Sequence, residues 1–290
     1  SKVAGSIAVK PGFGSFFIDW KNELRQNINV YAHLNYTQKG VHEERTLIYT
    51  SNLPVERWFI RDLDLTEQEP VSLKIRVEDT YGNITEYIDR GSFSLLEDEM
   101  IPKDKWTMPE NNEYIHDSVG GVPMGFLSAY EARAYYIMDG IVDNGQFEYI
   151  HTSGKGRTGV AAHGNVPWNI MINLGDEYEL SRIVTHQRLS GDQFYKSENV
   201  GIYAMYIWDG AEERWDSICE HKILFPAVSN IELKQLALAG DMAYFYPDDP
   251  QYTRPTRWFR YEALKSFSGN YTGTDANCLS EITLYAKKKK

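Results

Sequence analysis

Apolar and polar side chains alternate with a period of two through the first hundred residues, where helical periodicity is nearly absent. One such run extends from Ile28 to Tyr36 and another from Val71 to Glu78. This alternation is typical of strands that bury one face and expose the other to water. Turn residues such as Pro11-Gly12 and Tyr81-Gly82-Asn83 separate the runs. About seven short strands of this kind predict an antiparallel sandwich of the immunoglobulin or fibronectin type III kind over residues 1–98.

The pattern breaks between residues 99 and 125, where prolines and a Gly-Gly pair accumulate. We interpret this stretch as a linker between two domains. Trp106 and Met108 indicate that the linker packs partly on a neighbouring domain, because an exposed Trp is unfavourable.

Strand-like runs resume in the second half of the chain and predict a β jelly roll over residues 126–290. Gly175 is expected to end the first of these runs, and Asp209-Gly210 gives a strong hairpin signal after the third. A short helix is expected over Leu127–Met138. The main runs are Trp168–Leu174, Arg182–Arg188, Val200–Trp208, Arg257–Ala263 and Leu279–Tyr285.

Length, composition and charge fit this two-domain, all-β interpretation. The 290 residues are 42% hydrophobic and 24% charged, as in folded globular proteins. The net charge of −11 disfavours nucleic acid and anionic lipid as partners. No stretch approaches the ~18 to 20 apolar residues of a transmembrane helix. The two cysteines, Cys219 and Cys278, are interpreted as free and buried.

Short catalytic motifs fail on their structural context. Gly154-Lys155-Gly156-Arg157-Thr158-Gly159 matches a phosphate-binding pattern, but Gly164 and Pro167 leave no room for the helix that such a site needs. His42-Glu43-Glu44 lacks the second histidine of a zinc-protease helix. A pair of carboxylates brought together through space remains open, and with it a glycoside hydrolase or lyase.

Several segments of the second half, in their order and spacing, resemble a known family. They are Tyr136–Gly145, Tyr149–Ser153, Trp168–Gly175, Tyr203–Trp215 and Leu279–Ile282. Over about residues 125–286 they resemble the discoidin or coagulation-factor type C domain, a galactose-binding-like jelly roll. With the fibronectin-like module before it, the chain also resembles exported lipoproteins that gut bacteria encode with polysaccharide-uptake systems.

This resemblance implies a non-catalytic carbohydrate-binding protein at the bacterial outer-membrane surface or in the periplasm, lipid-anchored through a removed N-terminal segment. Its expected ligand is a poly- or oligosaccharide, and glycan-uptake proteins are further expected partners. A module that only docks on such proteins is the alternative to glycan binding. The resemblance also implies a structural calcium ion, because Ca²⁺ prefers oxygen ligands. The matching positions are Asp139, Asp143, Asn144 and Glu281.

A sugar site needs aromatic rings to stack on a pyranose, together with polar groups for its hydroxyls. The loops of the predicted jelly roll contain both kinds of residue, and we expect them to gather at one rim. The same rings could instead cover the end of the roll. The candidates are Arg157, Arg188, Phe194, Tyr195, Tyr246, Asp248, Tyr252 and Tyr271.

Overall fold

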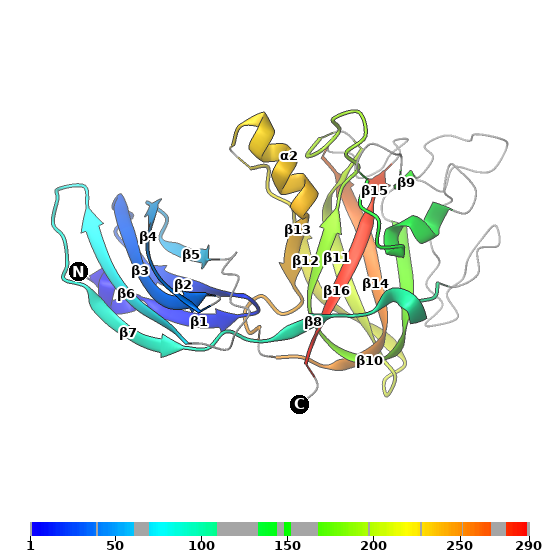
Figure 1. The fold of residues 1–290 in the computed structure, drawn as a ribbon, viewed down its shortest axis with the longest axis horizontal. Helices are drawn as coiled ribbons and strands as arrows, with labels where there is room; N and C mark the ends of the chain where they lie inside the picture. The colour runs from blue at the N-terminus through cyan, green and yellow to red at the C-terminus, as the bar shows by residue number, and fades with distance from the viewer. Residues whose placement is uncertain are drawn as a thin grey trace. The chain divides into compact units, whose positions relative to one another are not determined.

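The computed structural model describes residues 2–38, 40–60, 70–108, 133–143, 148–151, 168–196, 198–226, 228–250, 252–267 and 277–288. The chain divides into two compact units, Ser1–Glu97 and Asp98–Lys290. Both units consist of antiparallel β-sheets (Figure 1). The predicted all-β class, a sandwich followed by a jelly roll, is confirmed.

The first unit is a sandwich of two sheets. One sheet has the strand order β1-β2-β5 and the other has the order β4-β3-β6-β7. Its elements are α1 (Lys2–Ser6), β1 (Ala8–Gly12), β2 (Ser15–Lys21), β3 (Ile28–Gln38), β4 (Val41–Ser51), β5 (Val55–Ile60), β6 (Val71–Asp79) and β7 (Ile88–Phe93).

The alternation in the sequence accounts for the core of this sandwich. In β3 the side chains of Val30, Ala32 and Leu34 are fully buried, while the residues between them are partly exposed. Each of the three lies opposite a buried residue of β6, because the two strands pair in register. Trp20 of β2 packs into the same core from the other sheet.

The second unit is the jelly roll. Its elements are β8 (Asp98–Met100), the 3₁₀ turns η1 (Lys103–Lys105) and η2 (Arg133–Met138), β9 (Ile150–His151), β10 (Trp168–His186), β11 (Val200–Asp209), β12 (Arg214–Lys222), α2 (Asn230–Ala239), β13 (Asp241–Tyr244), β14 (Pro255–Ser266), β15 (Cys278–Leu279) and β16 (Glu281–Lys287). Within the described ranges, no helix is long and apolar enough to cross a membrane.

Strand β10 belongs to both layers of the roll. Its first half pairs with β14, and its second half pairs with β16 and β13. We expected the strand to end at Gly175, but the chain continues through a bulge there. Gly175 has a φ of +80°, and a Cβ at this position would lie 2.5 Å from the Cβ of Lys105. Glycine therefore allows the bend that carries one strand from one layer into the other.

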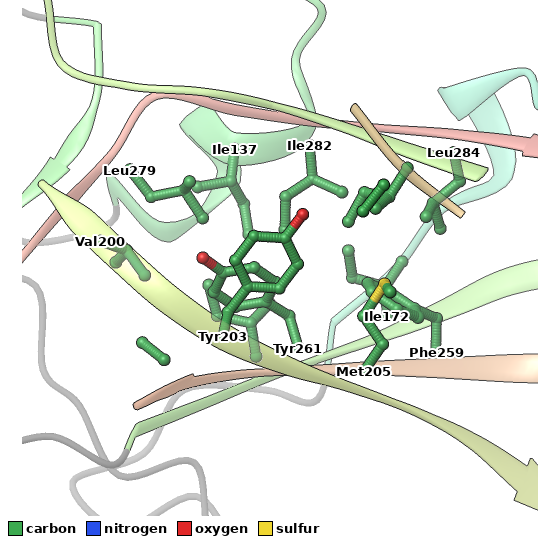
Figure 2. Packing of buried hydrophobic residues seen from close by; sticks show 14 of the residues in the cluster. Ile137, Ile172, Val200, Tyr203, Met205, Phe259, Tyr261, Leu279, Ile282 and Leu284 are labelled. Atoms are coloured by element: carbon green, nitrogen blue, oxygen red, sulfur yellow. The ribbon is translucent and has the colours of Figure 1, made fainter. Parts of the chain in front are cut away.

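The core of the roll lies between these two layers (Figure 2). Tyr203 of β11 and Tyr261 of β14 stack in one layer with ring centroids 4.8 Å apart. Ile282 and Leu284 of β16 enter the same cluster from the other layer, and all four side chains are fully buried.

The segment that we interpreted as the start of the linker is part of the roll. Strand β8 pairs with β16, and Ile101 and Trp106 are buried in the core of the second unit. Burial of these two apolar side chains explains why residues 98–108 form structure here. Residues 109–125 lie outside the described residues.

Two further expectations changed at the level of secondary structure. The segment Arg133–Met138 is a 3₁₀ turn, whereas residues 127–132 of the expected helix lie outside the described residues. Helix α2 was not expected at all. Both cysteines are free, as interpreted, with Cys278 buried and Cys219 partly exposed.

Candidate functional site

Strand register defines two ends of the jelly roll. One end, here called the α2 end, carries Trp168, Val200 and Glu281 and is where helix α2 lies. The other, here called the hairpin end, carries the turn between Asp209 and Arg214. Because neighbouring strands are antiparallel, successive loops fall on alternate ends.

The predicted sugar-site residues do not share one rim. Arg188, Phe194 and Tyr195 follow the C-terminal end of β10 and lie at the α2 end. Tyr246, Asp248 and Tyr252 follow β13, which runs antiparallel to β10, and lie at the hairpin end. Two other candidates, Arg157 and Tyr271, lie outside the described residues. The expectation of a single aromatic rim is therefore wrong for the described candidates.

Tyr195 and Arg188 are structural residues of the α2 end. Tyr195 is only 6% exposed, and its ring meets those of Phe225 and Phe267 edge to face. It is therefore not available to stack on a sugar, although its ring packs against that of Phe225. The guanidinium of Arg188 lies over the ring of Tyr149, with Nη1 3.4 Å from a carboxylate oxygen of Glu198.

A hollow of about 630 Å³ opens at the α2 end, between the loop after β10 and helix α2. Phe194 and Phe225 supply aromatic rings to its wall; Phe194 is half-buried, whereas Phe225 is 63% exposed. The other described lining residues are Asp192, Lys196, Asn230, Ile231, Leu233, Lys234, Gln235 and Leu238. The hollow therefore combines exposed ring faces with amide, ammonium and carboxylate groups.

Local side-chain hydrogen bonds hold the loop that carries Phe194 in an unusual conformation. Asp192 and Tyr195 both have φ angles above +50°, a region that non-glycine residues rarely adopt. The backbone N–H of Tyr195 donates a hydrogen bond to Oε1 of Gln187 at 2.6 Å. The amide of Asn199 donates to the carbonyl oxygen of Gln193 at 2.5 Å. These bonds fix the loop beside the hollow.

Helix α2, which the alternation of apolar and polar residues does not predict, forms the opposite wall. Ser229 and Glu232 form a capping box, in which each side chain hydrogen-bonds to the backbone of the other residue. Leu233 and Ala237, four residues apart, are the buried side chains that anchor the helix. The Ser-x-x-Glu spacing before an i, i+4 apolar pair was the signal that could have identified it.

At the hairpin end, the predicted aromatic residues pack mainly against each other. The rings of Tyr246 and Tyr252 meet edge to face with centroids 4.8 Å apart, and burial raises the pKa of Tyr246. Arg254 beside them donates to Oδ2 of Asp216 at 2.7 Å. Asp248 is exposed. The guanidinium of Arg254 is therefore already paired with a carboxylate.

Of the four residues that the resemblance assigns to calcium, Asp143 and Glu281 make other contacts. Asp143 is fully buried, and its carboxylate accepts hydrogen bonds from the backbone N–H groups of Leu189 and Ser190, each at 2.8 Å. Glu281 pairs with the ammonium of Lys103. Asn144 lies outside the described residues. Within the described ranges, no group of three His, Cys, Asp or Glu side chains is arranged to hold a metal ion.

Comparisons with solved structures found distant similarities. A SusE-like protein aligns over 99% of this chain and 98% of its own, with 18% identity and a TM-score of 0.47. A family 32 carbohydrate-binding module from a Clostridium perfringens glycoside hydrolase aligns over 65% of this chain and 95% of its own, with 16% identity and a TM-score of 0.40. A fucolectin from striped bass serum aligns over 99% and 87%, with 10% identity and a TM-score of 0.38. A search of curated proteins found no match.

Two family models match the sequence itself. Residues 1–103 match a domain of unknown function, DUF5126. Residues 139–286 match a second, DUF5000, which is also described as a domain of unknown function and covers more than half of the chain. The chain belongs to the DUF5000 family.

Proposed function

We propose that this protein binds a glycan without catalysing its turnover, and that the ligand occupies the hollow at the α2 end. The observation that carries this proposal is the ring of Phe225, which is 63% exposed at the wall of the hollow. An exposed ring backed by the buried Tyr195 is a rigid platform of the kind that stacks on the apolar face of a pyranose.

The polar lining of the hollow supports the same ligand. Asn230 and Gln235 offer amide donors and acceptors for sugar hydroxyls, and Lys196 and Lys234 offer further donors. Such a site is open and partly exposed, so we expect weak affinity for a single sugar unit. Useful retention would then come from several sites acting together.

Binding fits the described lining better than hydrolysis does. Asp192 is the one carboxylate among the described residues that line the hollow. A glycosidase that follows the common mechanism needs two carboxyl groups on opposite sides of the scissile bond. The described part of the hollow therefore supports a binding role.

The cellular setting forms part of this proposal and rests on the sequence resemblance given above. We place the protein at the surface of a bacterial outer membrane or in the periplasm, held by a lipid anchor and working with glycan-uptake proteins. Its ligand in that setting is a poly- or oligosaccharide.

The decisive experiment is affinity electrophoresis of the whole chain in gels that contain single polysaccharides, chosen from a glycan array. We expect Phe225→Ala to remove most of the retardation that the wild-type protein shows. Leu224→Ala is the matched control, because Leu224 is 71% exposed next to Phe225 and does not line the hollow. Retardation that survives Phe225→Ala would contradict this site, and no retention on any glycan would contradict the function.

Exposed apolar side chains on and before α2 favour a second candidate function, docking on another protein. Ile231 is 75% exposed and Leu224 is 71% exposed. If this candidate is correct, the protein is retained by no glycan of the array and binds a glycan-uptake protein instead. Leu224→Ser would then weaken that complex.

A further inference from the structure

Glu281 is a carboxylate held inside the jelly roll at the start of β16. It is only 1% exposed. One oxygen pairs with the ammonium of Lys103, and the other accepts a hydrogen bond from the backbone N–H of Gly140 at 3.0 Å. A buried carboxylate is costly unless a cation and hydrogen-bond donors surround it. Glu281 has both.

Lys103 is held in place by the structure on each side of it. Strand β8 pairs with β16, and the N–H of Ile101 donates to the carbonyl oxygen of Leu284 at 2.9 Å. On the other side, Thr107 and Asn173 exchange two backbone hydrogen bonds of 2.8 and 3.0 Å. The side chain of Lys103 is 14% exposed as a result.

The ammonium of Lys103 makes two further contacts, with a hydroxyl and with an aromatic ring. It donates to Oγ1 of Thr283 at 3.3 Å, and it lies 5.5 Å from the centre of the Trp106 ring. Both contacts favour a positive charge at this point. Lys103 is therefore bound as a charged group, with its methylene chain enclosed by the roll.

We propose that Lys103 is the resident cation of this part of the jelly roll and takes the place of the calcium ion that the sequence resemblance implies. The unit then folds and keeps its stability without a metal. This inference concerns the interior of the roll and does not depend on the proposed glycan site.

The surrounding charges agree with this assignment. The carboxylate of Asp143 is fully buried, and both of its oxygens are engaged: Oδ2 accepts from the N–H groups of Leu189 and Ser190, and Oδ1 accepts from the hydroxyl of Ser190. A divalent cation beside the ammonium would meet strong like-charge repulsion.

The jelly roll also needs residues that lie before the start of the DUF5000 match. Lys103 and Trp106 lie before residue 139, where the DUF5000 match begins. The buried carboxylate Glu281 is inside the match, and its cation is outside it. The segment 98–107 is thus an obligatory part of this jelly roll.

The test compares two charge-removing variants in the whole chain. Lys103→Met removes the ammonium and keeps most of the methylene chain, whereas Lys105→Met removes an exposed ammonium from the same 3₁₀ turn. We expect Lys103→Met to lower the melting temperature of the second unit by roughly 5 to 10 °C. Lys105→Met is expected to change it by about 1 °C or less. The wild-type melting temperature should be the same in EDTA and in calcium chloride.

A double variant separates charge from packing if Lys103→Met fails to fold. Glu281→Gln combined with Lys103→Met removes both members of the pair, and we expect it to recover at least half of the lost melting temperature. No recovery would overturn the assignment. So would a wild-type melting temperature that rises with calcium, or a Lys103→Met variant that melts like the wild type.

Discussion

The carboxylate of Asp143 accepts hydrogen bonds from both the backbone N–H and the hydroxyl of Ser190, at 2.8 and 2.7 Å. The two residues are 47 positions apart in the chain. On the other side, the N–H of Asp143 donates to Oγ of Ser280 at 2.7 Å. Asp143 therefore joins three loops of the α2 end, one of which continues to Phe194 at the hollow.

We predict that Asp143→Asn destabilises the second unit by about 2 to 4 kcal/mol. An asparagine keeps one oxygen for the two N–H groups, which both donate to Oδ2, but it loses the negative charge that strengthens these bonds, and its NH₂ group replaces the oxygen that accepts from the hydroxyl of Ser190. Asp139→Asn is the control, because the carboxylate of Asp139 is exposed and accepts a local bond from Ile141 at 2.8 Å. Urea unfolding followed by tryptophan fluorescence measures both. Equal midpoints for the two variants would contradict the role of Asp143.

We predict opposite pH effects from His186 and Glu281. Burial and Lys103 lower the pKa of His186 from 6.5 to about 4, so its contribution to stability rises as the pH rises from 4 to 6.5. Burial raises the pKa of Glu281 from 4.5 to about 7, against the opposing effect of Lys103. Its contribution therefore falls as the pH rises from 4.5 to 7. The two slopes nearly cancel in the wild type.

A variant that lacks the titrating carboxyl of Glu281 should show the pH dependence that His186 causes. In Glu281→Gln we expect the stability of the second unit to increase by up to ~3 kcal/mol between pH 4 and 6.5, since each pH unit is worth ~1.4 kcal/mol while only one state holds the proton. Urea midpoints at four pH values measure the slope, with the wild type as the reference. A slope of zero or of the opposite sign in the variant would refute the assignment to His186.

We predict that Cys278 does not react with thiol reagents in the folded protein. Its side chain is 1% exposed, and burial together with Glu198 raises the pKa of the thiol to about 12. At pH 8 the reactive thiolate is then on the order of one molecule in ten thousand. In Cys219→Ser, which leaves Cys278 as the single thiol, we expect labelling by a disulfide reagent only after urea is added. Stoichiometric labelling in native buffer would show that the Cys278 thiol is accessible in the folded protein, and it would contradict this prediction.

We predict that Gly240→Ala destabilises the second unit by more than 2 kcal/mol. Gly240 has a φ of +83°, and a Cβ there would lie 2.6 Å from Cγ1 of Val184 and 2.7 Å from Nε2 of His186. Gly191→Ala is the control for backbone strain alone, with a φ of +69° and no heavy atom closer than 3.9 Å to the added carbon. We expect it to cost about 1 kcal/mol. Equal urea midpoints would mean that the contacts at Gly240 relax freely.

The strands and much of the core could be predicted from the sequence because they depend on local periodicity. Val30, Ala32 and Leu34 in the first unit, and Ile170 and Ile172 in the second, are buried as the alternation predicts. Strand ends were harder to predict where a glycine interrupts the alternation. Gly175 was expected to end a strand, and instead it bends the strand from one layer into the other.

The candidate site depended on information that no local window contains. Whether Phe194 and Tyr246 lie at the same end of the roll depends on the direction of the strand that precedes each of them. Phe194 follows β10, whereas Tyr246 follows α2 and β13, and β13 runs antiparallel to β10. Tyr195 was a reasonable surface candidate by residue type, but Phe225 and Phe267 enclose it. Phe225 lines a hollow only because α2 packs beside it.

A period of two is encoded between nearest neighbours, so the all-β class, the order of sandwich and jelly roll, and most of the buried positions could be predicted from the amino-acid order. Which groups meet depends on the three-dimensional fold. Glu281 and Lys103 lie 178 residues apart, and Asp143 and Ser280 lie 137 apart. Contacts across such distances form when strands pair, and the free energy of a buried charge then depends on which partner the pairing provides.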